Sequence, residues 1–192
     1  MEEHKAYSEY LRSRKKISYI YKKFWLYPIL NKYLNGKVLD VGCGIGDFLS
    51  FRKGTIGIDI NENNVDFCLK RGLNAKMIKS GVFPVGDSQI DAVIMDNVLE
   101  HIIDPTQVLS EIKRVIKKGG NFVIGVPGIK GYQADPDHKK FYKEKNLIEL
   151  LNGYNFRLIK FLHAPLMIKS TFLDKKIRQY CIYGVFEFTD PN

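Results

Sequence analysis

The stretch "VLDVGCGIGDF", Val38 to Phe48, places three glycines within five positions directly behind a run of apolar residues. Glycine adopts positive φ angles and lets another group approach the backbone closely. A strand that ends in such a loop and continues into a helix therefore predicts a cofactor-binding loop, although the same glycines also suit a tight turn. In a dinucleotide loop the last glycine would fall at position 47, where this chain has Asp47. Since an acid at a helix entrance repels a diphosphate, the loop predicts a ligand without phosphates.

Apolar runs on both sides of this loop alternate with amphipathic segments. The runs that predict strands are residues 37–42, 54–60, 75–81, 90–97 and 121–127. Two later apolar segments, residues 156–168 and 180–188, predict a closing antiparallel pair. Strands that alternate with helices imply crossover connections. We therefore expect a doubly wound α/β fold with a mostly parallel, seven-stranded sheet that is covered on both faces.

Two helices are predicted after the fourth and fifth strands. The first covers residues 104–119, where Asp104 suits the N-cap, Pro105 the first helical position and Gly119 the C-terminal stop. The second covers residues 144–154. Both carry apolar residues at the three- and four-residue spacing of a helix that packs against a sheet.

A basic, aromatic segment precedes the core. Residues 1–36 predict a helix, in which apolar side chains recur at helical spacing until Pro28 interrupts them. We expect one domain over residues 1–192, with this segment ahead of a core formed by residues 37–192. Three roles suit the segment: a lid over the cofactor, a packing helix, or a helix that lies on a membrane surface.

Composition limits the kinds of partner and the cellular location that we expect for the protein. The chain has 192 residues and a net charge of +9, which favours acidic partners without choosing among them. It has no apolar run of eighteen residues, so we expect no transmembrane span. Frequent charges in the first thirty residues argue against a secretory signal, and three cysteines form neither an even set nor a C-x-x-C pair. We expect a cytoplasmic protein with reduced thiols.

Polar residues gather where the predicted strands end. Asp40 lies inside an apolar strand, where a carboxylate is costly unless it is paired. Asp59 ends the second strand, where a carboxylate can accept both hydroxyls of a ribose. Asn97, Glu100 and His101 follow the fourth strand. Because parallel strands end at one edge of the sheet, these groups are expected beside the glycine loop.

On these residues the sequence resembles the class I S-adenosylmethionine-dependent methyltransferases, in the small-molecule branch. The motifs are the "VLDVGCGIG" loop, "FP" followed by "DSQID", and "VLEH", and the resemblance covers roughly residues 36–156. It implies a Rossmann-like fold and S-adenosylmethionine as cofactor. The glycine loop would hold the methionine part, Asp59 the ribose, and the backbone of Gly81 and Val82 the adenine. The implied cofactor-binding residues are Asp40, Gly42, Cys43, Gly44, Asp59, Ile60, Gly81, Val82 and Asn97.

Two departures from the family pattern stand near the cofactor. Lys79 and Ser80 occupy the place where relatives often have Gly-Asp, so the carboxylate that commonly reads the adenine amino group is absent. The helix after the glycine loop is also short, because only eight residues separate Gly46 from Thr55.

His101 and His138 are the candidates for the catalytic proton acceptor. A hydroxyl that attacks a methyl group must lose its proton, and histidine titrates near neutral pH. A packing role for His101 and an exposed loop position for His138 are the alternatives. Together with Glu100 these histidines also resemble the cation site of metal-assisted members. Since Asn97 stands where those members tend to have a carboxylate, we predict no metal ligands, and the metal-dependent alternative stays open.

The predicted function is O-methylation of a small or medium acceptor. A sugar, glycan or nucleotide-sugar hydroxyl is the leading acceptor, because the chain resembles small methyltransferases that modify bacterial surface polysaccharides. The alternatives are another hydroxyl or amine metabolite such as a quinone precursor, RNA, or a partner subunit that binds the cofactor without catalysis. Against RNA stands the lack of an Asn-Pro-Pro-Tyr type motif after the fourth strand and of an appended binding module.

Overall fold

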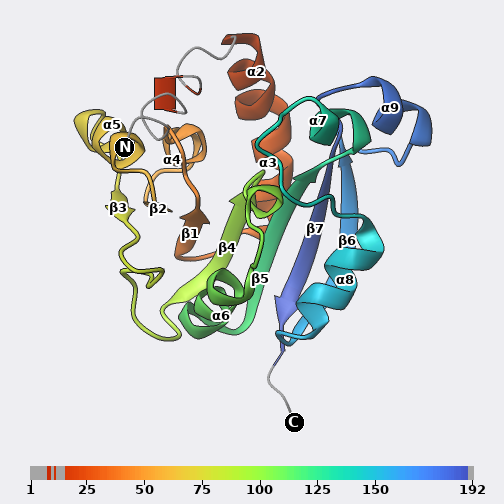
Figure 1. Cartoon of the computed structure of the whole chain (residues 1–192). Helices are drawn as coiled ribbons and strands as arrows, with labels where there is room; N and C mark the ends of the chain where they lie inside the picture. The colour runs from red at the N-terminus through yellow and green to blue at the C-terminus, as the bar shows by residue number, and fades with distance from the viewer. Residues whose placement is uncertain (1–7, 10, 12–15, 190–192) are drawn as a thin grey trace.

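One seven-stranded sheet organises the protein (Figure 1), whose computed structural model describes residues 8–9, 11 and 16–189. The strands are β1 (Val38–Val41), β2 (Ile56–Asp59), β3 (Ala75–Met77), β4 (Ile90–Asp96), β5 (Ile116–Pro127), β6 (Phe156–Ala164) and β7 (Cys181–Phe188). Their order across the sheet is β3-β2-β1-β4-β5-β7-β6. The first five are parallel, and β7 pairs antiparallel with both β5 and β6. The predicted doubly wound α/β fold is therefore confirmed, including its closing antiparallel pair.

Helices cover both faces of the sheet, as the apolar character of its central strands requires. The helices other than the N-terminal ones are α4 (Asp47–Phe51), α5 (Glu62–Lys70), α6 (Thr106–Val115), α7 (Ile129–Gln133), α8 (Glu144–Asn152) and α9 (Thr171–Lys176), with the short turn η3 (Leu99–His101) after β4. Side chains of β4 alternate between two cores: Val93 and Met95 pack with α6 and α8, and Ala92 and Ile94 face the N-terminal helices. No helix among the described residues has the length and apolar character needed to span a bilayer.

Helix α6 is shorter than the sequence predicts. Its start agrees within a residue, and Asp104 Oδ1 accepts the backbone N–H of Thr106 at 3.0 Å, as an N-cap does. The predicted end at Gly119 is wrong, because the helix stops at Val115 and β5 begins at Ile116. Ile116 is fully buried and pairs with Ile90 of β4. Burial against the sheet thus overrides the helical pattern.

The N-terminal segment is helical over its described part from residue 16. It consists of α2 (Lys16–Tyr21), the π-helical turn η1 (Lys22–Leu26), α3 (Tyr27–Leu30) and the 3-10 turn η2 (Asn31–Tyr33). Pro28 does not end the helix as predicted, but lies in the first turn of α3. Proline lacks an N–H and disturbs the preceding turn, and the wider π-helical turn lies directly before it. The rest of the predicted helix, residues 1–7, 10 and 12–15, lies outside the described residues.

An ion pair links the N-terminal segment to the sheet. Lys22 Nζ lies 2.8 Å from Asp96 Oδ2, at the carboxyl end of β4. The other carboxylate oxygen accepts the hydroxyl of Tyr183 at 2.8 Å and the amide of Asn97 at 2.7 Å. The Lys22 and Asp96 side chains are only 19% and 11% exposed. Burial tends to raise the pKa of Asp96, but Lys22 and these donors hold it below its usual value. The carboxylate is therefore charged, and the segment supplies its cation.

Replacing Lys22 by methionine is expected to destabilise the protein by about 3 kcal/mol, because it leaves a buried carboxylate without its cation. Urea unfolding followed by circular dichroism measures the loss. The matched control is Lys23→Met, one residue further on, where the ammonium lies over the rings of Tyr19 and Phe24 and a loss of about 0.5 kcal/mol or less is expected. Adding Asp96→Asn to Lys22→Met should recover part of the stability. Equal losses in the two single variants would contradict a structural role for the pair.

Candidate active site

The glycine loop connects β1 to α4 in the way its sequence predicts. Gly42 and Gly46 have φ angles of 72° and 80°, which side chains rarely allow. A Cβ atom on Gly42 would lie 2.5 Å from Val98, and one on Gly46 would lie 2.6 Å from Leu73. Both glycines are therefore required by the packing beneath the loop as well as by its turn. The following helix α4 has five residues, as short as the spacing to Thr55 predicts.

Asp59 holds this loop against β2. Its Oδ2 accepts the backbone N–H of Gly44 at 2.8 Å, and its Oδ1 accepts that of Asn61 at 2.7 Å. Only 6% of the residue is exposed, whereas the next residue, Ile60, is 63% exposed. A carboxylate oxygen can accept more than one hydrogen bond, so these contacts leave acceptor capacity for a ribose. Ribose binding by Asp59 stays a prediction.

Leu11 of the N-terminal segment packs on the other side of the loop. A Cβ atom on Gly44 would meet the Leu11 side chain at 3.3 Å, and Leu11 is 4% exposed. The N-terminal segment thus touches the predicted cofactor loop directly. This contact suits the lid and the packing roles of the segment alike.

A second acid, Asp40, is buried close to Asp59 and Asp96. It is 4% exposed, and burial together with these neighbouring carboxylates holds its pKa well above the usual value. Lys22 acts in the opposite direction. A buried group of carboxylates is stabilised by positive charge. This edge of the sheet therefore suits a cationic ligand.

The predicted adenine side of the site follows β3. Ser80 and Gly81 have φ angles of 51° and 74°, and Lys79 pairs with Val82 in an isolated antiparallel bridge. Gln107 of α6 donates from Nε2 to the Ser80 carbonyl at 3.1 Å. Val82 is 57% exposed. The turn thus presents an apolar side chain and backbone groups, as the missing carboxylate leads one to expect.

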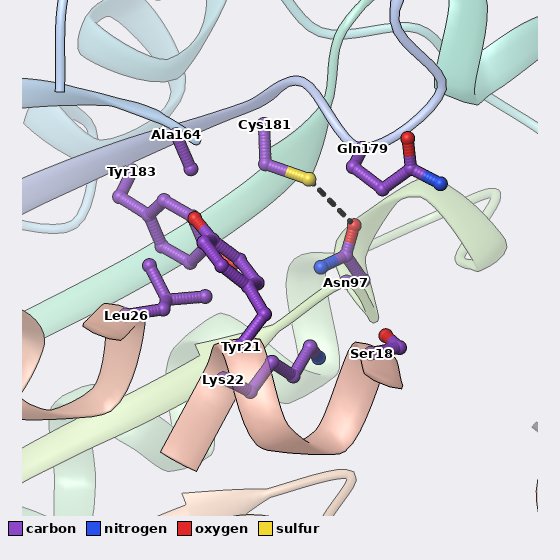
Figure 2. A pocket seen from close by; sticks show the side chains of 9 residues that line it. All are labelled: Ser18, Tyr21, Lys22, Leu26, Asn97, Ala164, Gln179, Cys181 and Tyr183. Atoms are coloured by element: carbon purple, nitrogen blue, oxygen red, sulfur yellow. Dashed lines mark hydrogen bonds between the residues drawn. The ribbon is translucent and has the colours of Figure 1, made fainter. Parts of the chain in front are cut away.

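A pocket lies between β4, β7 and the N-terminal helices (Figure 2). Its lining residues are Ser18, Tyr21, Lys22, Leu26, Asn97, Ala164, Gln179, Cys181 and Tyr183. Asn97, with a φ angle of 55°, accepts a weak hydrogen bond from the Cys181 thiol at 3.6 Å. Burial raises the pKa of Cys181 to about 12, so the thiol stays protonated at neutral pH. Cys181 therefore acts as a hydrogen-bond donor in the wall of the pocket and not as a nucleophile.

The structure brings His101 and His138 together. Their ring centroids are 4.8 Å apart, although His101 follows β4 and His138 lies in the loop after α7. His101 Nδ1 lies 3.1 Å from Asp137 Oδ2, and His138 Nδ1 lies 2.9 Å from the carbonyl oxygen of Tyr132. Because a carbonyl or carboxylate oxygen only accepts, each Nδ1 carries the proton. In the neutral rings Nε2 is then the proton acceptor.

Glu100 is a site residue that the predicted binding and catalytic set omits. It is 1% exposed, and neither carboxylate oxygen has a hydrogen-bond partner among the described residues. Burial raises its pKa to about 8. Its backbone carbonyl accepts the N–H groups of Lys139 and Lys140 at 2.7 and 3.1 Å, which fixes the loop that carries His138. In the sequence, Glu100 can be recognised as a site residue because it is an acid within an otherwise apolar turn.

Three of these groups have the donor set of a cation site. The nearest ligand atoms of Glu100, His101 and His138 all lie within 4.8 Å of one another, and His138 Nε2 is 3.8 Å from Glu100 Oε1. Imidazoles that bind metals usually donate their other N–H to a carbonyl or carboxylate, as both histidines do here. The metal-dependent alternative therefore has a specific candidate site.

The predicted cofactor residues all lie along the carboxyl ends of β1 to β4 or in the turns that follow, and the structure joins Gly44 to Asp59 directly. The Cys43 side chain is different, because it is buried beneath the loop with Cys68, Leu49 and Val65. Only its backbone is placed to meet a ligand at the loop.

Comparison with known proteins agrees with this architecture. A model of the methyltransferase domain family matches residues 39–124. An uncharacterized protein of Methanocaldococcus jannaschii is 32% identical over 136 residues, covering 65% of this chain and 66% of that protein. A probable S-adenosylmethionine-dependent methyltransferase of Mycolicibacterium smegmatis is 28% identical over 133 residues, covering 63% of this chain and 52% of that protein. A solved SAM-dependent methyltransferase of Thermotoga maritima has a TM-score of 0.75 at 17% identity, covering 97% and 98% of the two chains.

The fold, with its glycine loop after β1 and its antiparallel β7, is the Rossmann-like fold of methyltransferases. Residues 39–124 match the methyltransferase domain family, and the fold is that of solved S-adenosylmethionine-dependent methyltransferases, so the cofactor is S-adenosylmethionine. The matched segment spans about two thirds of the archaeal relative and about half of the mycobacterial one. S-adenosylmethionine carries an ammonium and a sulfonium, which suit the buried acids at this edge of the sheet.

Asp59→Ala is expected to weaken the binding of both S-adenosylmethionine and its demethylated product by about 1.5 to 3 kcal/mol. The substitution removes the charge-assisted contacts to the ribose and the acceptor of the Gly44 backbone N–H. Calorimetric titration of both ligands measures the change. Asp66→Ala on the exposed side of α5 is the control and should bind both ligands as the unchanged protein does. Unaltered affinity in Asp59→Ala would disprove the assigned ribose contact.

Proposed function

We propose that the protein transfers a methyl group from S-adenosylmethionine to a hydroxyl of a small acceptor, and that this acceptor is a sugar, a glycan or a nucleotide sugar. The observation that carries the proposal is the pair His101 and His138. Both imidazoles are held through Nδ1, so both have Nε2 as proton acceptor at the carboxyl edge of the sheet. A hydroxyl acceptor requires such a base.

His101 is the better base of the two. Its Nδ1–H donates to the Asp137 carboxylate, which stabilises the imidazolium that forms when Nε2 takes a proton. His138 donates from Nδ1 to a neutral carbonyl, and its neighbouring carboxyl, that of Glu100, faces Nε2 at 3.8 Å instead of Nδ1. Its position between Glu100 and the stacked ring of Tyr132 suits it to orient the acceptor. The cofactor supplies the electrophilic methyl group, and the two histidines supply proton removal and orientation.

The pocket beside Asn97 offers a few polar groups to the hydroxyls of an acceptor. Asn97 lies three residues before Glu100, and the mainly apolar pocket wall carries a hydroxyl from Ser18 and an amide from Gln179. Such groups exchange hydrogen bonds with sugar hydroxyls.

A divalent cation at Glu100, His101 and His138 is the second candidate for activating the acceptor. It is favoured by the buried Glu100 carboxylate, whose oxygens have no hydrogen-bond partner among the described residues. In this case the histidines would be ligands, and the acceptor hydroxyl would lose its proton to solvent or to a free base.

His101→Ala is expected to lower turnover by about 10² to 10⁴ with nearly unchanged affinity for S-adenosylmethionine, since a general base acts in the transition state. His138→Ala should mainly raise the KM of the acceptor. Rates between pH 6 and 9, with and without chelator, measure both effects. Full activity in both variants would refute the histidine mechanism. Loss of activity on chelation, restored by a divalent cation, would establish the metal-dependent alternative instead.

Acceptor identity is tested by following the demethylated cofactor in the presence of free sugars, nucleotide sugars, phenols, amines and RNA. Turnover is expected with sugar or nucleotide-sugar hydroxyls. The control is the His101→Ala variant, which should lose this turnover while binding the cofactor. Product formation with amines, phenols or RNA alone would replace the proposed acceptor class, and binding of the cofactor without turnover on any acceptor or in cell extract would support the non-catalytic subunit.

A further inference from the structure

Large apolar side chains are exposed in two short segments of the protein. Of the eleven exposed large apolar residues in the described part of the chain, six fall within residues 20–25 and 166–172. They are Ile20, Phe24, Trp25, Leu166, Ile168 and Phe172, each at least half exposed. Contiguous apolar surface of this kind marks a site of interaction with another molecule or with a membrane.

These two segments lie against each other. Trp25 Nε1 donates to the carbonyl of Pro165 at 2.9 Å, and the Tyr21 hydroxyl donates to the same oxygen at 3.4 Å. Figure 1 shows α2 and α9 at the same end of the molecule, beyond the carboxyl ends of the parallel strands. These six side chains, together with the lysines and arginines of residues 18–26 and 165–180, are called the apolar-basic surface below.

The charge of this surface has one sign. Residues 18–26 and 165–180 contain six lysines and arginines but a single acid, Asp174. The Asp174 carboxylate accepts the backbone N–H of Ile129 at 2.6 Å and so faces α7. Lys22 and Lys169 pair with the acids Asp96 and Glu144. The exposed bases of the second segment include Lys175 and Lys176.

We propose that the apolar-basic surface docks on the surface of an anionic phospholipid bilayer. Aromatic and aliphatic tips surrounded by lysines are the combination that enters the interface of such a membrane. A second copy of the chain on this surface would bring two basic rims together in a symmetric dimer, and like charges would oppose it. Nucleic acid would satisfy the lysines but not the aliphatic side chains of Leu166 and Ile168.

Docking would place the pocket beside Asn97 at the membrane, and the following consequence for the acceptor rests on the proposed function. Ser18, Tyr21 and Lys22 from the first segment and Gln179 from the second line that pocket, so its walls continue into the apolar-basic surface. An acceptor held in or on a bilayer would reach the pocket without crossing open solvent. This proposal goes beyond methyl transfer, and binding to vesicles can be measured in the absence of any acceptor or cofactor.

Trp25 is the only tryptophan of the chain and lies within the proposed contact. On addition of vesicles of phosphatidylcholine mixed with phosphatidylglycerol, its emission is expected to shift to the blue and to become protected from acrylamide quenching. Vesicles of phosphatidylcholine alone should give a weaker effect. Co-sedimentation with the same vesicles gives the partition coefficient independently.

The decisive variant changes the apolar tips and leaves the charge unaltered. Phe24→Ser combined with Phe172→Ser is expected to lower the partition coefficient at least about tenfold, because two aromatic rings no longer enter the bilayer. Leu69→Ser, at an exposed apolar position on α5, is the matched control and should bind like the unchanged protein. Lys175→Gln with Lys176→Gln should also weaken binding, whereas Lys53→Gln, at another exposed lysine, should not. Circular dichroism and cofactor binding show that each variant is folded.

Three results would overturn the proposal. An unchanged Trp25 emission with anionic vesicles would show that this surface does not enter the bilayer. Equal binding by the unchanged protein and by the variant with Phe24→Ser and Phe172→Ser would show that net charge alone attracts the protein to the vesicles. A dimer in sedimentation equilibrium that the two serine substitutions dissociate would identify a second copy as the occupant.

Discussion

The ion pair between Lys22 and Asp96 is the interaction on which the candidate site depends most. A carboxylate at the carboxyl end of a central strand is costly in an apolar core unless a cation and donors surround it. Lys22 supplies the cation at 2.8 Å, and Tyr183 of β7 supplies a hydroxyl. The N-terminal helices and the last strand therefore meet at β4. One residue further along, Asn97 begins the turn that carries Glu100 and His101.

The cofactor edge of the sheet is organised by the protein's own contacts. Asp59 fixes Gly44 at 2.8 Å, and the side chains of Val98 and Leu73 occupy the space that a Cβ would need on Gly42 and Gly46. The loop is thus held in its open turn by packing from beneath. Its residues have little freedom to lose when a ligand binds, which favours binding.

Local patterns in the sequence predict the strands, the glycine loop and the edge on which the polar residues lie. They cannot predict that β5 begins at Ile116, because this start depends on pairing with Ile90 and on burial from both sides. The partner of Lys22 is also beyond local patterns, since Asp96 is 74 positions away. Glu100 is visible as a carboxylate in an apolar turn, but its burial beside His138 depends on the loop after β5 folding back. Contacts between distant segments complete the site.

The position of β7 has a consequence for synthesis on the ribosome. This strand lies inside the sheet between β5 and β6, yet it is later in the chain than every other strand. Until residues 181–188 have left the exit tunnel, the hydrogen-bonding edge of β5 has no neighbour, and the walls formed by Cys181 and Tyr183 are missing. The sheet can close only after translation of its last strand, and an unpaired β5 edge is exposed to association with other nascent chains in that interval.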